Sequence, residues 1–413
     1  MTVAPFAPAR SLAGDWRRPA LIVLCGCLIS VISFGPRSSL GFFLTPQSQA
    51  NGWGRDVFGL ALAAQNILWG LGQPTAGILA DRFGIVRVLC TGCILYALGL
   101  ATMAFATTPL LLDISAGFLI GFGLAGCSFG IVLAAFGKLL PERWRLPAFG
   151  AGTAAGSFGQ FLYAPLTVSL IDGVGWQETL VIFGLVMLLV APASLALATR
   201  NAGSRVHQGS PQSLPQALSE AFAQRSYILL VLGYFTCGFQ LAFITVHLPA
   251  FLVDRGLAAE VGGWTIAAIG LFNIMGSLAS GWLGNLMPKR YLLSLIYAAR
   301  ALAILVFIAF PVSAASALLF GAVMGLLWLS TIAPTNGIIT VMFGTRWLAT
   351  LSGFAFFSHQ VGGFLGVWLG GVVFERTGSY DSVWYLSILF GLLSALINLP
   401  IVEKPVHRAV APA

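Results

Sequence analysis

The chain has few charged side chains, and those it has avoid the interior of its apolar segments. Of its 413 residues, 8% are charged and 58% are hydrophobic. An ordinary soluble domain has about 25% charged residues, which keep its surface compatible with water. The composition therefore excludes such a domain and indicates an integral membrane protein embedded in a lipid bilayer.

Acidic side chains are absent from the interior of the long apolar segments. No Asp or Glu lies deep in any long apolar segment, whereas Arg37 and Arg300 do. An Arg at the centre of a membrane span costs about 2.5–3.5 kcal/mol even on permissive insertion scales, so its side chain faces protein or water. Since no buried acid is available to pair with either guanidinium, we expect the missing partner to be an anionic substrate.

Motifs for nucleotide or covalent chemistry are also missing. The chain has no Gly-x-x-x-x-Gly-Lys-Ser/Thr loop, and no catalytic triad, carboxylate pair or metal constellation at usable spacing. Its six cysteines all fall in apolar segments, and Cys90-x-x-Cys93 lacks the second pair that a zinc site needs. We therefore expect no enzyme, no metal and no cofactor, and any energy input must come from a gradient.

Long apolar runs are abundant. A helix needs about 20 apolar residues to cross roughly 30 Å of hydrocarbon. The runs predict an all-α integral membrane protein with twelve transmembrane helices, near residues 20–44, 57–80, 86–106, 110–137, 148–170, 178–199, 227–253, 262–286, 291–310, 315–341, 348–374 and 383–402.

The longest polar break divides these spans six and six. It is rich in Ser, Gln, Gly and Pro, and it predicts an N-terminal six-helix half at 1–199, a linker at 200–225 and a C-terminal six-helix half at 226–413. The stretch 77–84 after the second span has a degraded echo at 281–290 after the eighth. Two such pseudo-repeats predict a binding site near the membrane midplane between the halves.

Lys and Arg residues in the short breaks are strongly biased to one side. That side holds both termini and the linker, so the positive-inside rule predicts that all three are cytoplasmic, in the inner membrane of a cell. The net charge of +8 is spread over many separate loops on this one side, so topology accounts for it and nucleic acid is not an expected partner. We expect a monomer.

One loop motif carries a family resemblance. Gly77-x-Leu79-Ala80-Asp81-Arg82-x-Gly84, followed by Arg87, resembles the loop between spans 2 and 3 of the major facilitator superfamily. Within that superfamily, the stretches 34–43, 52–53 and 358–363 are similar to bacterial relatives of the monocarboxylate transporters and the oxalate:formate antiporter. The resemblance implies secondary transport by alternating access.

The resemblance also implies roles for particular residues. It places Arg37 where relatives have a cation for substrate binding or proton coupling, and His359 where the oxalate antiporter has a basic residue that binds its dianion. It implies a gating latch at Asp81 and Arg82, for which an ordinary charged turn is the alternative. The substrate-binding Arg of span 8 has no counterpart here, because residues 271–277 read Leu-Phe-Asn-Ile-Met-Gly-Ser.

Physical chemistry supports several of these candidates and adds others. A planar guanidinium suits a carboxylate, which favours Arg37 as a substrate ligand over a side chain that snorkels to the interface. For Arg300, bonds to carbonyls of neighbouring helices are favoured over substrate contact. His359 can titrate near neutral pH and is a candidate for proton coupling as well as binding, with packing as the alternative. His247 is a weaker candidate for coupling.

Polar residues inside spans complete the predicted site. Such side chains face other helices or a wet cavity, and we expect Gln65, Asn66, Tyr163 and Asn273 to line the pathway. The predicted function is proton symport of a small organic anion, most simply a monocarboxylate. The absent span 8 Arg and the many aromatic residues favour, as an alternative, a larger solute such as a vitamin, and a drug or metabolite exporter is a further one.

Overall fold

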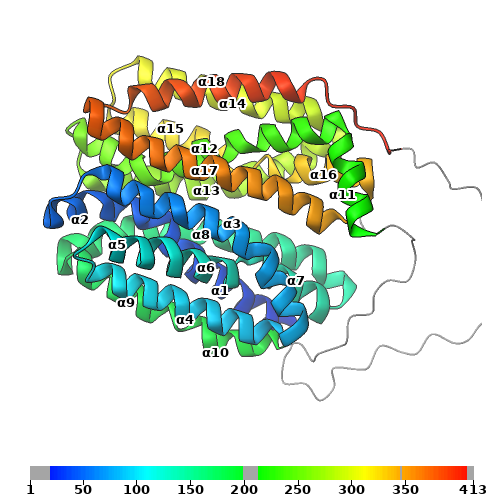
Figure 1. The fold of residues 1–413 in the computed structure, drawn as a ribbon, viewed down its shortest axis with the longest axis horizontal. Coiled ribbons are helices and arrows are strands. Elements are labelled where there is room, and N and C mark those ends of the chain that lie inside the picture. The colour runs from blue at the N-terminus through cyan, green and yellow to red at the C-terminus, as the bar shows by residue number, and fades with distance from the viewer. Residues whose placement is uncertain (1–18, 199–212, 345–346, 407–413) are drawn as a thin grey trace, which may run out of the picture.

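The computed structural model describes residues 19–198, 213–344 and 347–406, and gives only the backbone for a few helical positions, Asp81 among them. Every element in these ranges is a helix. The helices run roughly parallel to one another and form two bundles, one from each half of the chain (Figure 1).

The first bundle contains the helices before residue 199, coloured blue to green in Figure 1. Several spans are interrupted by short turns of another helical type. Its elements are α1 (Pro19–Ser39), η1 (Leu40–Phe43), α2 (Leu44–Asn51), α3 (Arg55–Phe83), α4 (Ile85–Ala104), α5 (Pro109–Leu112), η2 (Asp113–Leu119), α6 (Ile120–Gly126), α7 (Phe129–Leu139), α8 (Glu142–Val174), α9 (Trp176–Met187), α10 (Val190–Ser194) and η3 (Leu195–Leu197).

The second bundle contains the helices from α12 onward, coloured green to red. The short helix α11, which a Ser213 capping box begins, precedes it inside the predicted linker. The elements are α11 (Leu214–Ala223), α12 (Arg225–Asp254), α13 (Ala259–Leu286), α14 (Lys289–Ala309), α15 (Ala314–Leu327), α16 (Ile332–Phe343), α17 (Leu348–Thr377) and α18 (Asp381–Asn398).

The membrane spans agree with the twelve that the sequence predicts. Within the described residues, eleven helical segments are long and apolar enough to cross a bilayer. The segment that falls short is α3, which carries Gln65, Asn66 and Gln73. Its 29 residues are about 43 Å long at 1.5 Å per residue, and it packs lengthwise on α17. It is therefore the twelfth span, with its polar side chains turned toward protein.

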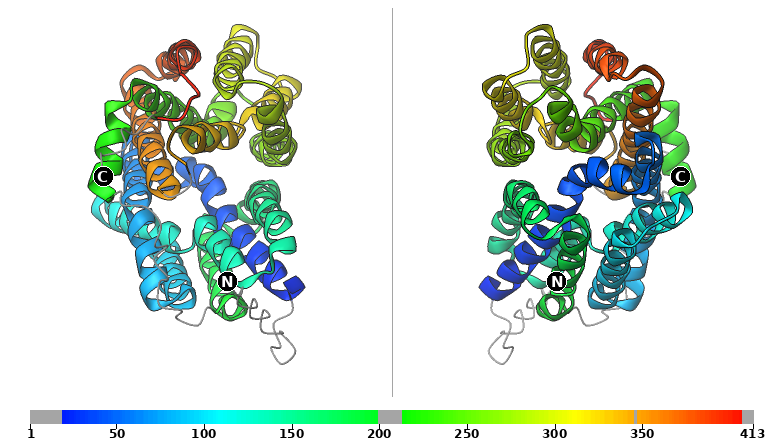
Figure 2. Two further views of the ribbon diagram at one scale, coloured as in Figure 1. Left: turned by 90° about the vertical axis from the view of Figure 1, so that its right-hand side faces the viewer. Right: turned by 90° about the vertical axis from the view of Figure 1, so that its left-hand side faces the viewer.

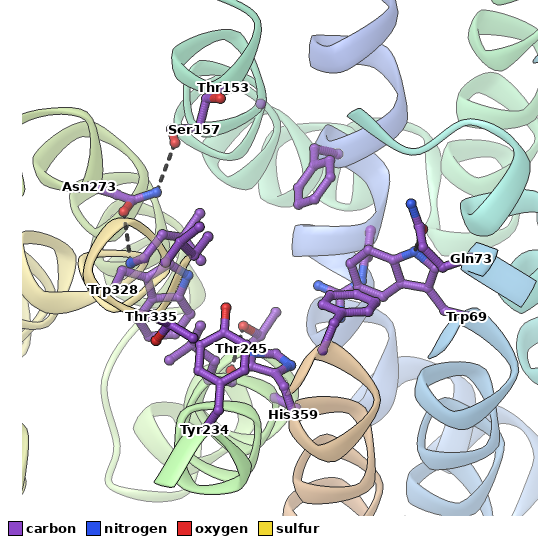
Figure 3. A pocket seen from close by; sticks show the side chains of 18 of the residues that line it. Trp69, Gln73, Thr153, Ser157, Tyr234, Thr245, Asn273, Trp328, Thr335 and His359 are labelled. Atoms are coloured by element: carbon purple, nitrogen blue, oxygen red, sulfur yellow. Dashed lines mark hydrogen bonds between the residues drawn. The ribbon is translucent and has the colours of Figure 1, made fainter. Parts of the chain in front are cut away.

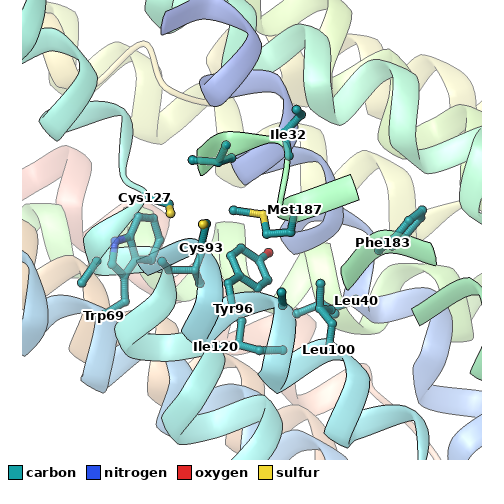
Figure 4. Packing of buried hydrophobic residues seen from close by; sticks show 14 of the residues in the cluster. Ile32, Leu40, Trp69, Cys93, Tyr96, Leu100, Ile120, Cys127, Phe183 and Met187 are labelled. Carbon is teal, nitrogen blue, oxygen red and sulfur yellow. The ribbon is translucent and has the colours of Figure 1, made fainter. Parts of the chain in front are cut away.

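Each bundle has its own apolar core. In the first, Tyr96 and Cys93 of α4 pack with Cys127, Ile120 and Met187 of neighbouring helices (Figure 4). All six cysteines are free thiols. Lipid tails are as apolar as these side chains, so close backbone approach rather than hydrophobic burial holds such helices together.

Gly92 shows how tight that approach is. A Cβ added to this residue of α4 would lie 2.8 Å from the Cα of Gly126 in α6. Real Cβ atoms do not come so close to backbone atoms, because the backbone of a packed helix cannot move aside as a flexible side chain can. Glycine at both positions is therefore needed for the contact between α4 and α6.

We expect Gly92→Val to destabilise the first bundle. Overpacking a tight contact costs about 1–3 kcal/mol, so the midpoint of thermal unfolding in detergent should fall clearly. Gly173→Val is the matched control, because a Cβ at Gly173 meets nothing within 4 Å. Equal midpoints for the two variants would contradict the packing argument.

The two bundles touch along α3 with α17 and along α8 with α13. Figure 2 shows the molecule end-on, with the second bundle above the first. Near the chain reversals at 51–55, 254–258 and 377–381, backbones of opposite halves nearly meet: a Cβ on Gly371 would lie 2.6 Å from the carbonyl oxygen of Arg55. We call this side the closed face.

The opposite side, which we call the terminal face, holds the first residue of α1, the α3–α4 turn at Gly84 and the first residue of α12. Glycines near this face are not crowded. A Cβ on Gly77, Gly281 or Gly353 would meet nothing within 4 Å. The close backbone contacts between the halves thus occur at the closed face and not at these three glycines.

Candidate functional site

Arg55, at the start of α3, joins the two halves at the closed face. Its guanidinium donates two hydrogen bonds to the Asp254 carboxylate at the end of α12, at 2.6 and 2.7 Å, and a third to the Tyr380 hydroxyl at 2.8 Å. Its backbone N–H donates to Oε1 of Glu375 at 2.6 Å, and its guanidinium carbon lies 3.8 Å from the centre of the Phe374 ring.

The sequence did not identify this network. Arg55 and Asp254 lie 199 positions apart, in two separate short loops, and only the tertiary contact pairs them. A bidentate pair of this kind, with the Arg55 side chain 13% exposed, is stronger than an ordinary surface ion pair.

We expect Asp254→Asn to favour opening at the closed face. Losing such a pair costs about 1 kcal/mol, which is roughly a fivefold change in population. The measurement is the rate at which a membrane-impermeant thiol reagent, added from the closed face, labels Thr245→Cys in a chain whose six native cysteines are replaced. Asp254→Asn should raise this rate several-fold.

Asp381→Asn provides the matched control. Asp381 is paired with Arg255 at 3.6 Å, but both side chains are at least half exposed, so the loss should leave the labelling rate unchanged. A rate for Asp254→Asn equal to that of this control would show that the Arg55 pair does not hold the face closed.

A cavity of about 290 Å³ lies between the halves, below the closed face. Figure 3 shows it from close by, with side chains entering from both bundles. It extends toward the terminal face as far as Ser352 and Gly353, near the start of α17. The first bundle contributes Phe34, Arg37, Ser38, Trp69, Gln73, Thr153, Gly156, Ser157 and Gln160, and the second contributes Tyr234, Leu241, Ala242, Thr245, Asn273, Trp328, Leu329, Ile332, Thr335, Asn336, Ser352, Gly353, Ala355, Phe356 and His359.

Arg37 is the cation of this cavity. It lies in the last turn of α1, where the negative end of the helix dipole favours a positive side chain. Its Nη2 donates to Oδ1 of Asn66 at 3.0 Å, and its guanidinium carbon lies 4.5 Å from the centre of the Trp69 ring. Its Nε has no partner, and no ion pair to Arg37 occurs within the described residues.

His359 of α17 enters the same cavity from the other half. Its ring stacks on Phe356, with centroids 5.8 Å apart, and lies 5.2 Å from the ring of Tyr234. Its Nδ1 is 2.9 Å from Oε1 of Gln360, which orients the imidazole. Arg37 and His359, predicted on separate helices, therefore share one cavity.

Of the predicted polar lining residues, Asn273 lies on the wall of this cavity. Gln65 and Asn66 lie beside it, around a much smaller void that they share with Arg37. The Gln65 amide is engaged, since Nε2 donates to the Ala116 carbonyl at 2.7 Å. Asn66 acts through Arg37, whose guanidinium it positions.

Tyr163 does not line the cavity. It is buried against Gly35, and its ring centre lies 5.1 Å from that of Phe183 in a tilted arrangement, so the expectation that it faces the pathway is wrong. A tyrosine ring fills the space that Gly35 leaves in α1. Its role is packing between α1 and α8.

Arg300 is also placed away from the cavity, so its predicted contact with substrate is corrected. It is fully buried in α14, and it donates to the carbonyl oxygens of Leu327 and Trp328. Leu327 is the last residue of α15 and Trp328 the first residue after it, so both carbonyls lie at the C-terminal end of that helix. The interpretation that the sequence favoured for Arg300, bonds to carbonyls of neighbouring helices, agrees with these hydrogen bonds.

His247 lies with the closed-face network and not in the cavity. It is fully buried in α12, with Nε2 2.8 Å from the Val367 carbonyl oxygen and Nδ1 3.3 Å from the Tyr380 hydroxyl. Both ring nitrogens are thus engaged, and the residue is separated from any solute in the cavity. This placement gives no support to a direct part in proton coupling.

The predicted gating pair is at the terminal face. The side chain of Asp81 lies outside the described residues. Arg82 is exposed at the end of α3, with its guanidinium carbon 5.2 Å from the ring centre of Phe83. A gating latch formed by Asp81 and Arg82 stays a prediction. It would lie at the terminal face, where the close backbone contacts of the closed face do not occur.

The aromatic part of the cavity was missed by the sequence reasoning. Phe34, Trp69, Phe356 and Tyr234 line it, yet aromatic residues occur in nearly every span and none of these four stands out. Ser157 was missed for a similar reason, since it lies in a glycine-rich run that indicates close helix packing.

This arrangement defines a class of protein: a membrane-spanning carrier with a solute cavity between two six-span bundles. Comparisons with known proteins agree. The sequence profile of the Major Facilitator Superfamily matches residues 26–367. The chain belongs to that superfamily, and it is a multi-pass secondary transporter.

Relatives are similar over almost the whole chain. The Bacillus subtilis protein "Uncharacterized MFS-type transporter YcxA" is 27% identical over 385 residues, covering 89% of this chain and 91% of that protein. Human monocarboxylate transporter 11 is 26% identical, covering 92% and 82%, and rat monocarboxylate transporter 13 is 28% identical, covering 92% and 88%.

Solved structures show the same fold. A bacterial homologue of the lysosomal transporter Spinster superposes with a TM-score of 0.74 at 16% identity, covering 93% of this chain and 97% of that one. A D-xylose–proton symporter superposes with a TM-score of 0.71 at 15% identity, covering 94% and 99%.

Proposed function

We propose that the protein carries a small organic anion, a monocarboxylate, across the inner membrane by alternating access and proton symport. The observation that carries the proposal is Arg37, a guanidinium on the cavity wall that has an amide and an aromatic ring as partners but no acid. A carboxylate of the solute would provide the acidic partner that Arg37 lacks, since guanidinium donors form planar, charge-assisted hydrogen bonds with carboxylates.

The rest of the cavity suits the organic part of such an anion. Phe34 and Trp69 on one side and Trp328 and Phe356 on the other provide apolar surface. Eleven of the lining side chains carry a hydroxyl or an amide, and eight of these form hydrogen bonds within the protein. A solute with one charged end and an apolar end fits this distribution better than a dianion does.

Larger solutes are the second candidate. The cavity of about 290 Å³ and its aromatic walls leave room for a ring beside the carboxylate. The names of the similar monocarboxylate transporters favour small acids, while the lining favours an aromatic acid or an acidic vitamin. The common requirement is a single carboxylate for Arg37.

The closed and terminal faces support alternating access. Contact at the Arg55 network and separation beside Gly77, Gly281 and Gly353 describe one of the two end states. The terminal face collects most of the loop Lys and Arg residues, so we assign it to the cytoplasm. The structure then corresponds to a state that faces inward.

Arg37→Gln tests the anion site. Charge-assisted bonds contribute about 1.5–3 kcal/mol, so the KM for the solute should rise roughly tenfold or more. The measurement is uptake of labelled pyruvate, lactate and an aromatic monocarboxylate into proteoliposomes, with and without an inward proton gradient.

Arg376→Gln is its matched control, because that Arg is exposed at the end of α17, outside the cavity. Equal uptake by Arg37→Gln and this control would overturn the role of Arg37. Lack of uptake of every acid by folded wild-type protein would overturn the monocarboxylate proposal.

His359→Gln tests proton coupling. The variant keeps a polar side chain but cannot take up a proton, so gradient-driven uptake should fall while solute exchange at equal pH on both sides continues. Gradient stimulation equal to wild type would show that His359 is not the carrier and that the proton travels on the solute.

A further inference from the structure

The tenth span, Ala314–Phe343, is broken near its middle. α15 ends at Leu327 and α16 begins at Ile332, so residues 328–331 are not helical. Trp328, Leu329 and Ile332 at this break line the cavity. Irregular backbone at membrane depth persists only where protein satisfies its polar groups.

Arg300 donates hydrogen bonds to the backbone carbonyls at the start of the break. Its Nε donates to the Leu327 carbonyl at 3.1 Å, and its Nη2 donates to the carbonyls of both Leu327 and Trp328. These groups form the C-terminal end of α15, which carries partial negative charge. Backbone carbonyls thus compensate two of the three nitrogens of this fully buried cation, and its Nη1 has no partner.

Asn273 of α13 accepts a hydrogen bond from a backbone N–H group within the break. Its Oδ1 accepts the Leu329 N–H at 3.0 Å and the Ser277 hydroxyl at 3.1 Å. Its Nδ2 donates to the Ser157 hydroxyl at 2.8 Å, and Ser157 belongs to α8 in the other half (Figure 3). One buried amide therefore contacts both the break and the opposite bundle.

We propose that Arg300 and Asn273 are positioning residues for the transport that the proposed function assigns to the cavity. Together they hold the α15–α16 break as a defined part of the cavity wall. Asn273 also links that wall to α8, so its amide cannot turn for one partner without disturbing the other. A solute that contacts Trp328 or Leu329 shifts the break, and the Asn273 side chain transmits this shift to its hydrogen bond with Ser157 in the other half.

The substitution Arg300→Met tests the positioning of the break without any solute. In purified protein, hydrogen–deuterium exchange of the backbone amides of residues 328–332 should become about tenfold faster, because the carbonyls lose their donor and the turn opens. Arg300→Lys, which keeps a donor and the charge, should restore part of the protection. Ser277→Ala removes only a side bond to Asn273 and should exchange as wild type does.

Unchanged exchange in Arg300→Met would overturn the positioning role of Arg300. Exchange in Arg300→Lys that is as fast as in Arg300→Met would also overturn it. Lys keeps a hydrogen-bond donor that Met lacks, so a difference between the two variants shows that the donor and not general packing protects the break. Because no solute is present, these outcomes do not depend on whether the monocarboxylate proposal is correct.

Ser157→Ala tests the link between the halves, because it removes the bond to Asn273 and leaves the Leu329 contact in place. The variant should raise labelling of the Thr245→Cys reporter from the closed face about threefold, and in uptake it should change Vmax by a larger factor than KM. Asn273→Leu, which also loses the Leu329 contact, should change KM as well.

Labelling and Vmax equal to wild type in Ser157→Ala would overturn the coupling through Asn273. An unchanged KM in Asn273→Leu would overturn its effect on the cavity wall. If the wild-type protein transports none of the acids, the proposed function fails, while exchange and labelling still decide the roles of Arg300 and Asn273.

Discussion

The structure depends on how it accommodates two guanidinium groups at membrane depth without an acidic side chain. Arg300 is compensated by backbone carbonyls at Nε and Nη2, which α15 allows because it ends where these groups can reach them, while its Nη1 has no partner. Arg37 is compensated in part, by Asn66 and the face of Trp69, and its Nε remains without a partner at the cavity. The same residue type thus supports the cavity wall in one half and, in the proposed function, provides the binding group in the other.

A second constraint is the uneven contact between the bundles. At the closed face, glycines bring opposing backbones together and Arg55 ties α3 to α12 and α18. At the terminal face, no comparable crowding occurs around Gly281 and Gly353. Since each set of contacts is local to one face, breaking one set and forming another moves the bundles without unpacking either core. Asn273 and Ser157 lie between the two faces, at the depth of the cavity.

Sequence reasoning predicted the fold well, and it named some of the residues that line the cavity. The twelve spans follow from apolar runs, although α3 is polar enough that length and packing rather than hydropathy identify it. Arg37 and His359 were found because a titratable side chain inside a span demands a protein or aqueous environment. The same rule could not separate Arg37 from Arg300, or His359 from His247, because it constrains burial and not the partner. Tyr163 was misplaced since a polar aromatic group serves packing as readily as lining.

The sequence by itself determined the membrane class, the number of spans and the family, because these depend on composition, run length and a local motif, all of which lie along the chain. Only the tertiary structure decided which polar groups converge. The pairing of Arg55 with Asp254, the closure of one face and the break held by Arg300 and Asn273 all join residues on separate helices. The rotation and depth at which two helices meet follow from close packing along their full lengths, which no local pattern records.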